Sequence, residues 1–371
     1  MSFLAIVLDK LGNQQAGLDR DPPRSAVESF LPRLKTLLLI AGLFALLILC
    51  GMAYQAIGAA LDRRRFPPPG RMLDIGGRRL HLIDSGQGGP SVIFESGISA
   101  SCLNWTHVRT QVAGFTRACA YDRASLGWSD PAPAPRVASA IVDDLHALLA
   151  AAKIPPPYVL VGHSFGGLLI RAYGATHPDQ VAGLVLIDPL APSEWLDLAP
   201  AQSRMLGRGV KLSRRGALLA RIGLVRFSLG LLSNGGRRIA KAIARVSSGS
   251  GESVISRLVG EVRKMPREVW PMVQAHWCQP ESFQGMADYL ESLPASSAEA
   301  AALAPPSTIP VIVLSAGHST PAQLAQREEL ARHALHGRHV VASNSGHWIH
   351  LDEPELIVHS IQEMFELIRK A

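Results

Sequence analysis

From residue 71 onward the chain alternates short apolar runs with longer helix-like segments, and this alternation limits the possible folds more than any other feature. Most of the runs are rich in Val, Ile and Leu without polar alternation, which is typical of strands buried on both faces of a sheet. The predicted strands cover 71–75, 78–84, 91–95, 116–122, 158–162, 181–188, 309–316 and 338–342. The predicted helices lie at about 138–152, 165–177, 321–335 and from about 354. This order predicts an α/β fold with a mostly parallel sheet flanked by helices.

A long insertion at 191–304 separates two of the predicted strands and has no strong strand signal. Its clearest part, 210–232, has apolar residues at helical spacing with arginines between them, which predicts a helical cap. Residues 191–300 contain 15 Lys and Arg against 9 Asp and Glu, so most of the net charge of +7 lies here. Two alternatives explain that charge: a helix face exposed to solvent, or a contact with anionic lipid.

An uncharged apolar run at 36–54 precedes the α/β pattern, and its low polarity continues to Leu61. About 20 apolar residues span the bilayer core as a helix. A core helix seldom lacks a polar stripe over five turns, and a cleaved signal peptide fits poorly because a long, partly acidic segment comes first. We therefore expect a single-pass membrane anchor. Basic residues flank both of its ends, and their distribution only weakly favours a cytoplasmic C-terminal domain. The sequence therefore leaves open on which side of the membrane that domain lies.

The predicted domains follow from these segments. They are an N-terminal tail at 1–35, a transmembrane anchor at 36–61, a linker at 62–70, an α/β core at 71–190 and 305–371, and a helical cap at 191–304. The linker contains the stiff sequence FPPPG, so the folded enzyme is expected to begin near Arg71.

Composition excludes several other classes of protein. The four cysteines, at 50, 102, 119 and 278, form no CxxC pair and no metal-ligand spacing with the histidines, so neither a disulfide framework nor a metal site is expected. The chain is basic, yet it has no zinc-finger, RNP-like or helix-turn-helix signal, so no nucleic-acid partner is expected.

The motif that carries chemistry is GHSFG, in which Gly162, Ser164 and Gly166 form a GxSxG pattern between a predicted strand and a predicted helix. A sharp strand-to-helix turn projects the serine hydroxyl, and glycines on either side avoid collisions. The N–H groups at the start of the helix point toward developing negative charge. Ser164 is therefore the candidate nucleophile.

Several segments together resemble the α/β-hydrolase superfamily from about residue 71 to the end. They are ESG after the third strand, YDRASLGWSD at 121–130, the GxSxG turn, and SGHWIHLDEPE at 345–355. The second segment is similar to the DxRGxGxS segment of cap-bearing members such as epoxide hydrolases and haloalkane dehalogenases. Those two activities use an aspartate nucleophile where this chain has Ser164. The resemblance therefore implies the esterase, lipase and peptidase side of the superfamily.

The resemblance also implies the partners of Ser164. His347 lies where the family places its catalytic histidine, and a neutral imidazole there takes the serine proton and returns it to the leaving group. No carboxylate follows the strand at 309–316 until Glu328, so the usual acid position is empty. Some members supply the acid from the preceding strand, where Asp188 stands. Glu95 and Asp352 are the second and third candidates.

The predicted oxyanion hole uses the N–H groups of Phe165 and Ile98, the latter from the turn that replaces the family's HG motif. The resulting hypothesis is a serine hydrolase that cleaves a carboxylic ester, including a lipid-like one, through an acyl-enzyme without metal or cofactor. Amidase, peptidase and thioesterase chemistry use the same residues. A catalytically silent, membrane-tethered binding module is the alternative from another class.

Overall fold

The computed structural model describes residues 24–233, 260–304 and 307–370. The chain divides into two compact units, 1–53 and 54–371. Most of the predicted N-terminal tail (1–23), part of the predicted cap (234–259) and residues 305, 306 and 371 lie outside the described residues.

Helix α2 runs from Arg24 to Arg65 and contains the predicted anchor. Within the described part of the chain, it is the one helix that is long and apolar enough to cross a membrane. Its most apolar 18-residue window has a mean hydropathy of 2.6, and none of that window is buried. Such exposure differs from that of a core helix in a soluble protein, which buries its apolar side chains.

The second unit contains an eight-stranded sheet in the order β1-β2-β4-β3-β5-β6-β7-β8. Strand β2 pairs antiparallel with β1 and β4, and all other neighbours are parallel. The strands are β1 (Arg71–Asp74), β2 (Arg79–Ser85), β3 (Ser91–Glu95), β4 (Ala118–Tyr121), β5 (Tyr158–His163), β6 (Val181–Ile187), β7 (Val311–Ala316) and β8 (Gly337–Ala342). The predicted fold class is therefore confirmed.

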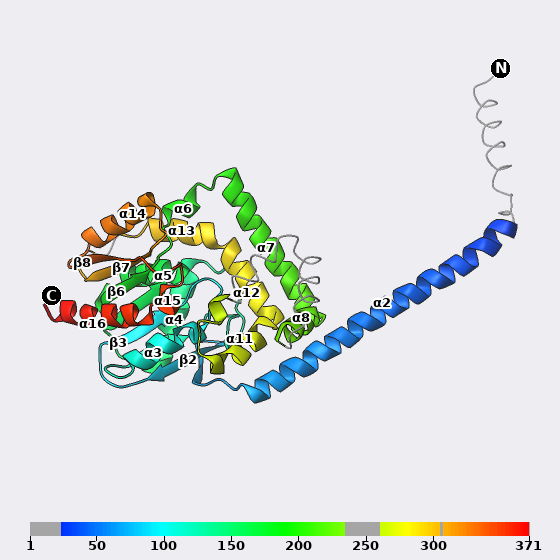
Figure 1. Cartoon of the computed structure of the whole chain (residues 1–371), viewed down its shortest axis with the longest axis horizontal. Helices are drawn as coiled ribbons and strands as arrows, with labels where there is room; N and C mark the ends of the chain where they lie inside the picture. The colour runs from blue at the N-terminus through cyan, green and yellow to red at the C-terminus, as the bar shows by residue number, and fades with distance from the viewer. Residues whose placement is uncertain (1–23, 234–259, 305–306, 371) are drawn as a thin grey trace, which may run out of the picture. The chain divides into compact units, whose positions relative to one another are not determined.

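Helices cover both faces of the sheet, as the apolar strands require (Figure 1). Along β5, Val159 and Val161 enter one apolar core and Leu160 enters the other, because successive side chains of a strand point to opposite faces. The first core is completed by α3 (Thr106–Val112) and α16 (Pro354–Lys370). The second is completed by α4 (Ala138–Ala152), α5 (Phe165–Thr176) and α14 (Pro321–Arg332).

A helical insertion separates β6 from β7, and Figure 1 shows most of its helices gathered on one side of the sheet. Its described helices are α6 (Ser193–Leu196), α7 (Pro200–Arg221), α8 (Leu224–Ser233), η3 (Arg267–Val269), α11 (Trp270–Trp277), α12 (Pro280–Glu291) and α13 (Leu293–Ala301). The single helical segment predicted at 210–232 is two helices, because Gly223 has a φ of 76° and ends α7. Tyr289 and Leu293 pack against Phe165, so the insertion covers the start of α5.

The described part of the unit also contains three short helices: η1 (Cys102–Trp105), η2 (Pro178–Gln180) and α15 (Ile349–Asp352). The unit itself begins at Tyr54, whereas the sequence places its start near Arg71. The difference has a physical cause: the last turns of α2 contact the insertion, and Phe66 accepts a hydrogen bond at 2.9 Å from the Trp128 indole.

Candidate active site

The predicted site residues meet at one edge of the sheet. Ser164 directly follows β5, Asp188 follows β6, and Ile98 and His347 lie in the loops after β3 and β8. These four strands are mutually parallel within the sheet, so their carboxyl ends share that edge, where α/β folds place their sites.

Ser164 occupies a strained turn between β5 and α5, with φ 54° and ψ −117°. A non-glycine residue in such a region costs on the order of 1–3 kcal/mol and is found where the surroundings enforce it. A Cβ on Gly162 would lie 2.6 Å from the Gly166 carbonyl oxygen, and one on Gly166 would lie 2.7 Å from that of Ser96. Both glycines are thus required by close packing, and the turn leaves the serine side chain half-buried at the start of α5.

His347 and Asp188 form a hydrogen-bonded pair in which Nδ1 of the imidazole lies 2.5 Å from Oδ2 of the carboxylate. The His347 side chain is 31% exposed and that of Asp188 is 9% exposed. A carboxylate at this distance accepts the Nδ1 proton, so the Nε2 lone pair of the imidazole is free to accept another.

The other oxygen of Asp188 accepts hydrogen bonds from Arg327 Nη1 at 2.6 Å and from the Ala316 N–H at 3.0 Å. Burial alone raises the pKa of Asp188. The hydrogen bond to His347, the Arg327 cation and the Ala316 N–H together outweigh it and hold that pKa below its usual value. The carboxylate therefore stays ionised.

Arg327 is a site residue that sequence reasoning missed. It lies in α14, a polar helix that carries no family motif, and it is 8% exposed. The only signal was its spacing, because Arg327 stands three residues after Leu324 and four before the buried Ala331. That spacing puts it on the inward face of the helix, where a cation requires a partner.

The loop that carries His347 rests on the residue before the nucleophile. Nε2 of His163 donates to the His347 carbonyl oxygen at 2.8 Å, and the two rings lie 4.6 Å apart between centroids. Among the described residues, no hydrogen bond joins the Ser164 hydroxyl to His347. Catalytic hydrogen bonds are often long without substrate and shorten when it binds.

The two predicted oxyanion donors belong to segments that adjoin Ser164. Phe165 is the first residue of α5, and the N–H groups of a helix's first turn have no partner within the helix. The loop with Ile98 is also adjacent, because a Cβ on Gly97 would lie 3.8 Å from Cβ of Ser164.

Arg123 fixes the orientation of this loop. Its guanidinium donates to the carbonyl oxygens of Ser96, at 2.6 Å, and of Gly97. The Gly97 carbonyl shares a planar peptide with the Ile98 N–H, which points the opposite way. Holding the carbonyl on Arg123 therefore turns the Ile98 N–H away from Arg123.

The two alternative acids do not bind His347. Glu95 is 1% exposed and forms an ion pair with Arg123, while the Tyr121 hydroxyl donates to its other oxygen. Burial nonetheless raises the pKa of Glu95. Asp352 accepts the Gly346 N–H at 2.9 Å and pairs with Lys264. Each carboxylate thus supports a loop of the site.

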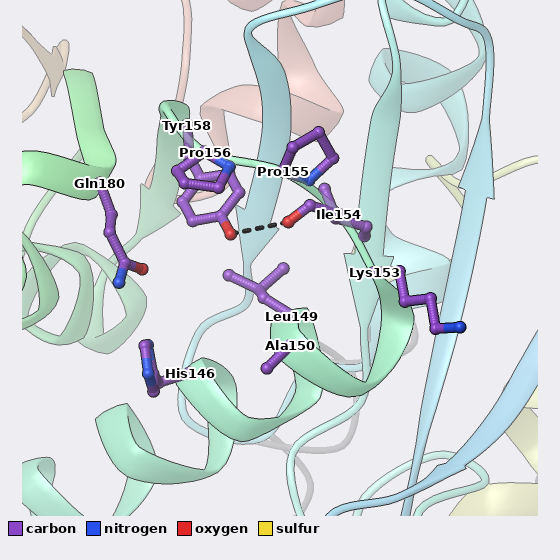
Figure 2. A pocket seen from close by; sticks show the side chains of 9 residues that line it. All are labelled: His146, Leu149, Ala150, Lys153, Ile154, Pro155, Pro156, Tyr158 and Gln180. Carbon is purple, nitrogen blue, oxygen red and sulfur yellow. Dashed lines mark hydrogen bonds between the residues drawn. The ribbon is translucent and has the colours of Figure 1, made fainter.

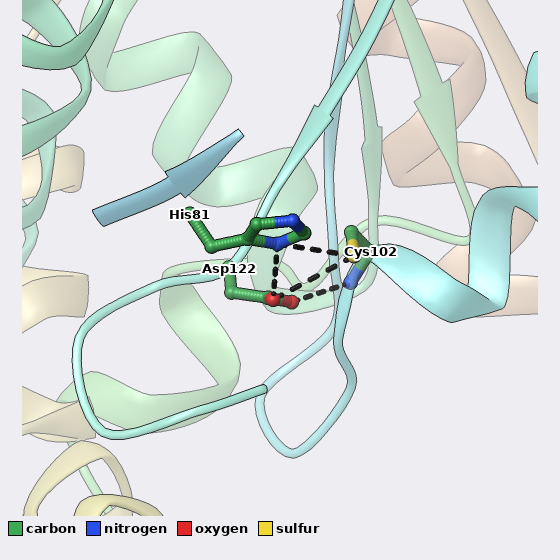
Figure 3. A group of neighbouring side chains, drawn as sticks. All are labelled: His81, Cys102 and Asp122. Carbon is green, nitrogen blue, oxygen red and sulfur yellow. Dashed lines mark hydrogen bonds and ion pairs between the residues drawn. The ribbon is translucent and has the colours of Figure 1, made fainter. Parts of the chain in front are cut away.

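A buried cluster of His81, Cys102 and Asp122 lies at the start of η1 and combines three side chains of metal-ligating type (Figure 3). Asp122 accepts hydrogen bonds from His81 Nδ1 and from the Cys102 N–H, both at 2.8 Å, and from the Trp128 N–H at 3.2 Å. These bonds tie β2, η1 and the loop after β4 together. Because the carboxylate oxygens of Asp122 already accept these hydrogen bonds, we assign the cluster a structural role.

One described pocket lies away from this edge, at the amino end of β5 (Figure 2). It has a volume of about 400 Å³ and is lined by His146, Leu149, Ala150, Lys153, Ile154, Pro155, Pro156, Tyr158 and Gln180. Tyr158 begins β5 and Ser164 follows its end, so the length of the strand separates this pocket from the nucleophile.

Sequence comparison matches part of the chain to a known family. A family model described as the alpha/beta hydrolase fold matches residues 90–209. YqjL of Bacillus subtilis, an uncharacterized protein, is 33% identical over 28% of this chain and 41% of its own length. A haloalkane dehalogenase of Sphingobium indicum is 34% identical over 37% of this chain and 47% of its own length. An uncharacterized vacuolar membrane protein of Saccharomyces cerevisiae is 33% identical over 27% of this chain and 16% of its own length.

The chain thus spans less than half the length of each of these relatives. Its structural match to solved proteins, in contrast, covers nearly the full length of those proteins. A thermophilic esterase from Thermogutta terrifontis has a TM-score of 0.54 and 21% identity, covering 78% of this chain and 94% of the esterase. A putative epoxide hydrolase from Pseudomonas aeruginosa has a TM-score of 0.61 and 14% identity, covering 81% and 96%. At these identities the likeness shows the fold.

The family match, the sheet order and the strained serine turn agree with one another, and its relatives in this fold include hydrolases of several kinds. The chain has the α/β-hydrolase fold, and its residues 90–209 match the model of that family.

Proposed function

We propose that this protein is a membrane-anchored serine hydrolase that cleaves a carboxylic ester through an acyl-enzyme. The observation that carries the proposal is the Asp188–His347 hydrogen bond at the sheet edge where the strained turn presents Ser164. A nucleophile, a base and an orienting acid are the three groups that acyl transfer by serine requires.

In the first half of the reaction, Nε2 of His347 takes the proton of Ser164 as the hydroxyl oxygen attacks the ester carbonyl. The imidazolium that forms is stabilised by Asp188, which stays ionised throughout. The tetrahedral oxyanion binds between the N–H groups of Phe165 and Ile98. His347 then gives its proton to the alkoxide leaving group, and the acyl group remains on the serine.

In the second half, a water molecule attacks the acyl-serine. His347 accepts a proton from that water and returns it to Oγ of Ser164 as the carboxylic acid leaves. The cycle consumes one ester and one water and yields an acid and an alcohol, so the three residues regain their starting protonation states.

The surroundings of Ser164 favour a hydrophobic acyl group. Leu190 donates its N–H to the Ser164 carbonyl oxygen at 3.1 Å, and Ile98 lies in the loop beside the serine. Both side chains are half-buried and pack against the apolar cluster that joins α5 to the insertion. Binding of an apolar chain there gains roughly 0.8 kcal/mol per buried CH₂.

Anchoring through α2 completes the proposal. The helix has the length and composition of a span, and a vacuolar membrane protein is among the relatives. We propose a single pass through the membrane at 36–61, which would hold the active site near a lipid surface.

Labelling with a fluorophosphonate probe tests the function directly. We expect the full-length protein to be labelled at Ser164, and the variants Ser164→Ala and His347→Ala to remain unlabelled while keeping the wild-type circular dichroism spectrum. Hydrolysis of p-nitrophenyl esters of increasing chain length would then give the acyl preference. An unlabelled wild-type protein that is folded would instead support a silent binding module.

A further inference from the structure

The apolar part of α2 is longer than a membrane core. As a helix, residues 36–61 extend for about 39 Å, whereas the hydrocarbon core is about 30 Å thick. The final turns of this run belong to the compact unit that begins at Tyr54. With 36–61 as the proposed span, these turns lie within or next to the headgroup layer of the membrane at any tilt of the helix.

The helical insertion is bound to these same turns. Gln55 donates to the Cys278 carbonyl oxygen at 2.8 Å and accepts a hydrogen bond from Arg226 at 2.9 Å. Arg226 also forms an ion pair at 2.6 Å with Asp62, and a Cβ on Gly58 would lie 2.6 Å from its Nε. The insertion is therefore held at the point where the predicted span ends.

Apolar side chains stay exposed around this contact. Tyr54, Ile57 and Leu61 occupy one side of the last turns of α2 and are 46%, 62% and 58% exposed. Phe227 of α8, next to Arg226 in the sequence, is 49% exposed. Large apolar side chains that gather beside a predicted span suit a lipid environment.

The face of α7 that points away from the protein is basic and partly apolar. Its opposite face buries Val210, Ala217 and Ala220. The exposed cations are Arg204, Arg208, Lys211, Arg214, Arg215 and Arg221, and the exposed large apolar residues are Met205, Leu212 and Leu218. Within the described residues, Arg214 pairs with Glu291 and none of the other five has a carboxylate partner.

We propose that an outer face of the insertion lies on the anionic lipid surface of the membrane that α2 spans. This outer face consists of Met205, Leu212, Leu218 and Phe227 with the cations Arg204, Arg208, Lys211 and Arg215. Long basic side chains reach the headgroups while the apolar residues between them enter the acyl boundary. Continuity with the end of the span favours lipid over a protein or nucleic-acid partner.

The inference rests on the membrane span of the proposed function, and the experiment separates the two. A cysteine replaces Leu218, Phe227 or, as control, Leu335 in a Cys50→Ser background, and each is labelled with bimane. Leu335 is 49% exposed and lies between α14 and β8, outside the insertion. The remaining cysteines are buried, and burial raises the pKa of Cys119 to about 12 and that of Cys278 to about 11, so they resist labelling.

Each labelled full-length protein is reconstituted in phosphatidylcholine vesicles with phosphatidylglycerol and lipids that carry a shallow nitroxide. Because interfacial helices enter the membrane by about 5–10 Å, we expect strong quenching at positions 218 and 227 and little at 335. Equal, weak quenching at all three positions overturns the inference. Carbonate extraction tests the span itself: protein released from the vesicles counts against the anchor, and retained but unquenched protein counts only against the outer face.

A pair of charge variants tests the role of the cations. Removing a basic residue from a surface that contacts anionic lipid weakens the contact by about fivefold. Arg208→Gln with Lys211→Gln should therefore lose most of the extra quenching at position 218 that phosphatidylglycerol produces. Arg369→Gln with Lys370→Gln removes the same charge from the exposed end of α16 and should leave that extra quenching unchanged. Equal effects of the two pairs would show that only net charge matters.

Discussion

At the residue scale, Asp188 has two tasks, because one oxygen binds His347 and the other binds Arg327. Asp188→Asn should lower turnover by up to about 10⁴-fold, since the imidazole loses its tautomer and the imidazolium its counter-charge. The same change leaves the buried Arg327 without its anion and should cost roughly 3–5 kcal/mol of stability. Ester kinetics and urea unfolding of the purified variant measure the two effects. Glu95→Gln and Asp352→Asn, whose carboxylates do not contact His347, should lower turnover far less than Asp188→Asn does.

Arg327→Gln tests whether the Arg327 cation affects catalysis through the pKa of Asp188. The Arg327 cation helps to hold the pKa of Asp188 down, so its removal should raise that pKa. An acid that protonates at higher pH moves the acid limb of the kcat profile toward neutral pH. We expect turnover on the plateau to stay within about tenfold of wild type because the catalytic groups remain. An unmoved acid limb would show that Arg327 acts only in folding.

Arg123 should act as a positioning residue for the oxyanion loop. Arg123→Lys keeps a cation for Glu95 but cannot hold the Ser96 and Gly97 carbonyls with one planar group. Because one oxyanion donor supplies about 10²–10³ in kcat, a misdirected Ile98 N–H should lower kcat with little change in KM. A variant with raised KM and unchanged kcat would contradict this assignment.

At the scale of elements, the sheet could be predicted from the sequence and the contacts of α2 could not. Strand β5 is buried on both faces, and its run of apolar residues shows this directly. The predicted acid, Asp188, was sought after β6 because no carboxylate follows β7 until Glu328. By contrast, the contacts of Gln55 and Asp62 with Arg226 join distant parts of the chain, and no local pattern records them. Arg327 was not predicted either, because its partner Asp188 is also distant in the sequence.

Two truncated proteins test the contact between α2 and the insertion. A protein starting at Tyr54 keeps Gln55 and Asp62, whereas one starting at Arg71 leaves Arg226 without either partner. An unpaired buried polar group costs about 1–3 kcal/mol, more when it is charged, so the shorter protein should be less stable by at least that amount. Urea unfolding of both measures the difference. Arg226→Met should recover part of it in the shorter protein and should destabilise the longer one.

At the scale of the whole molecule, buried histidines should make stability depend on pH. Burial lowers the pKa of His163 far below its usual value and that of His350 to about 3. Below about pH 6.5 the unfolded chain binds these protons and the folded protein does not, so stability falls as the pH falls, by about 1.4 kcal/mol per unit for each histidine. His350→Phe keeps the stacking on Trp105 and should reduce the slope by one proton.

The contact between Tyr289 and Arg123 also predicts how sequences of this kind diverge. The Tyr289 ring lies 5.1 Å from the Arg123 guanidinium, and its hydroxyl donates to the Ala124 carbonyl oxygen at 2.8 Å. The insertion thereby touches the residue that orients the oxyanion loop. When substrate specificity changes during evolution, residues on the outward side of α7 can be replaced easily, because their side chains contact only solvent or lipid. A replacement at Tyr289, however, has to pack in the apolar core and also keep the contact with Arg123. We therefore expect that position to change last.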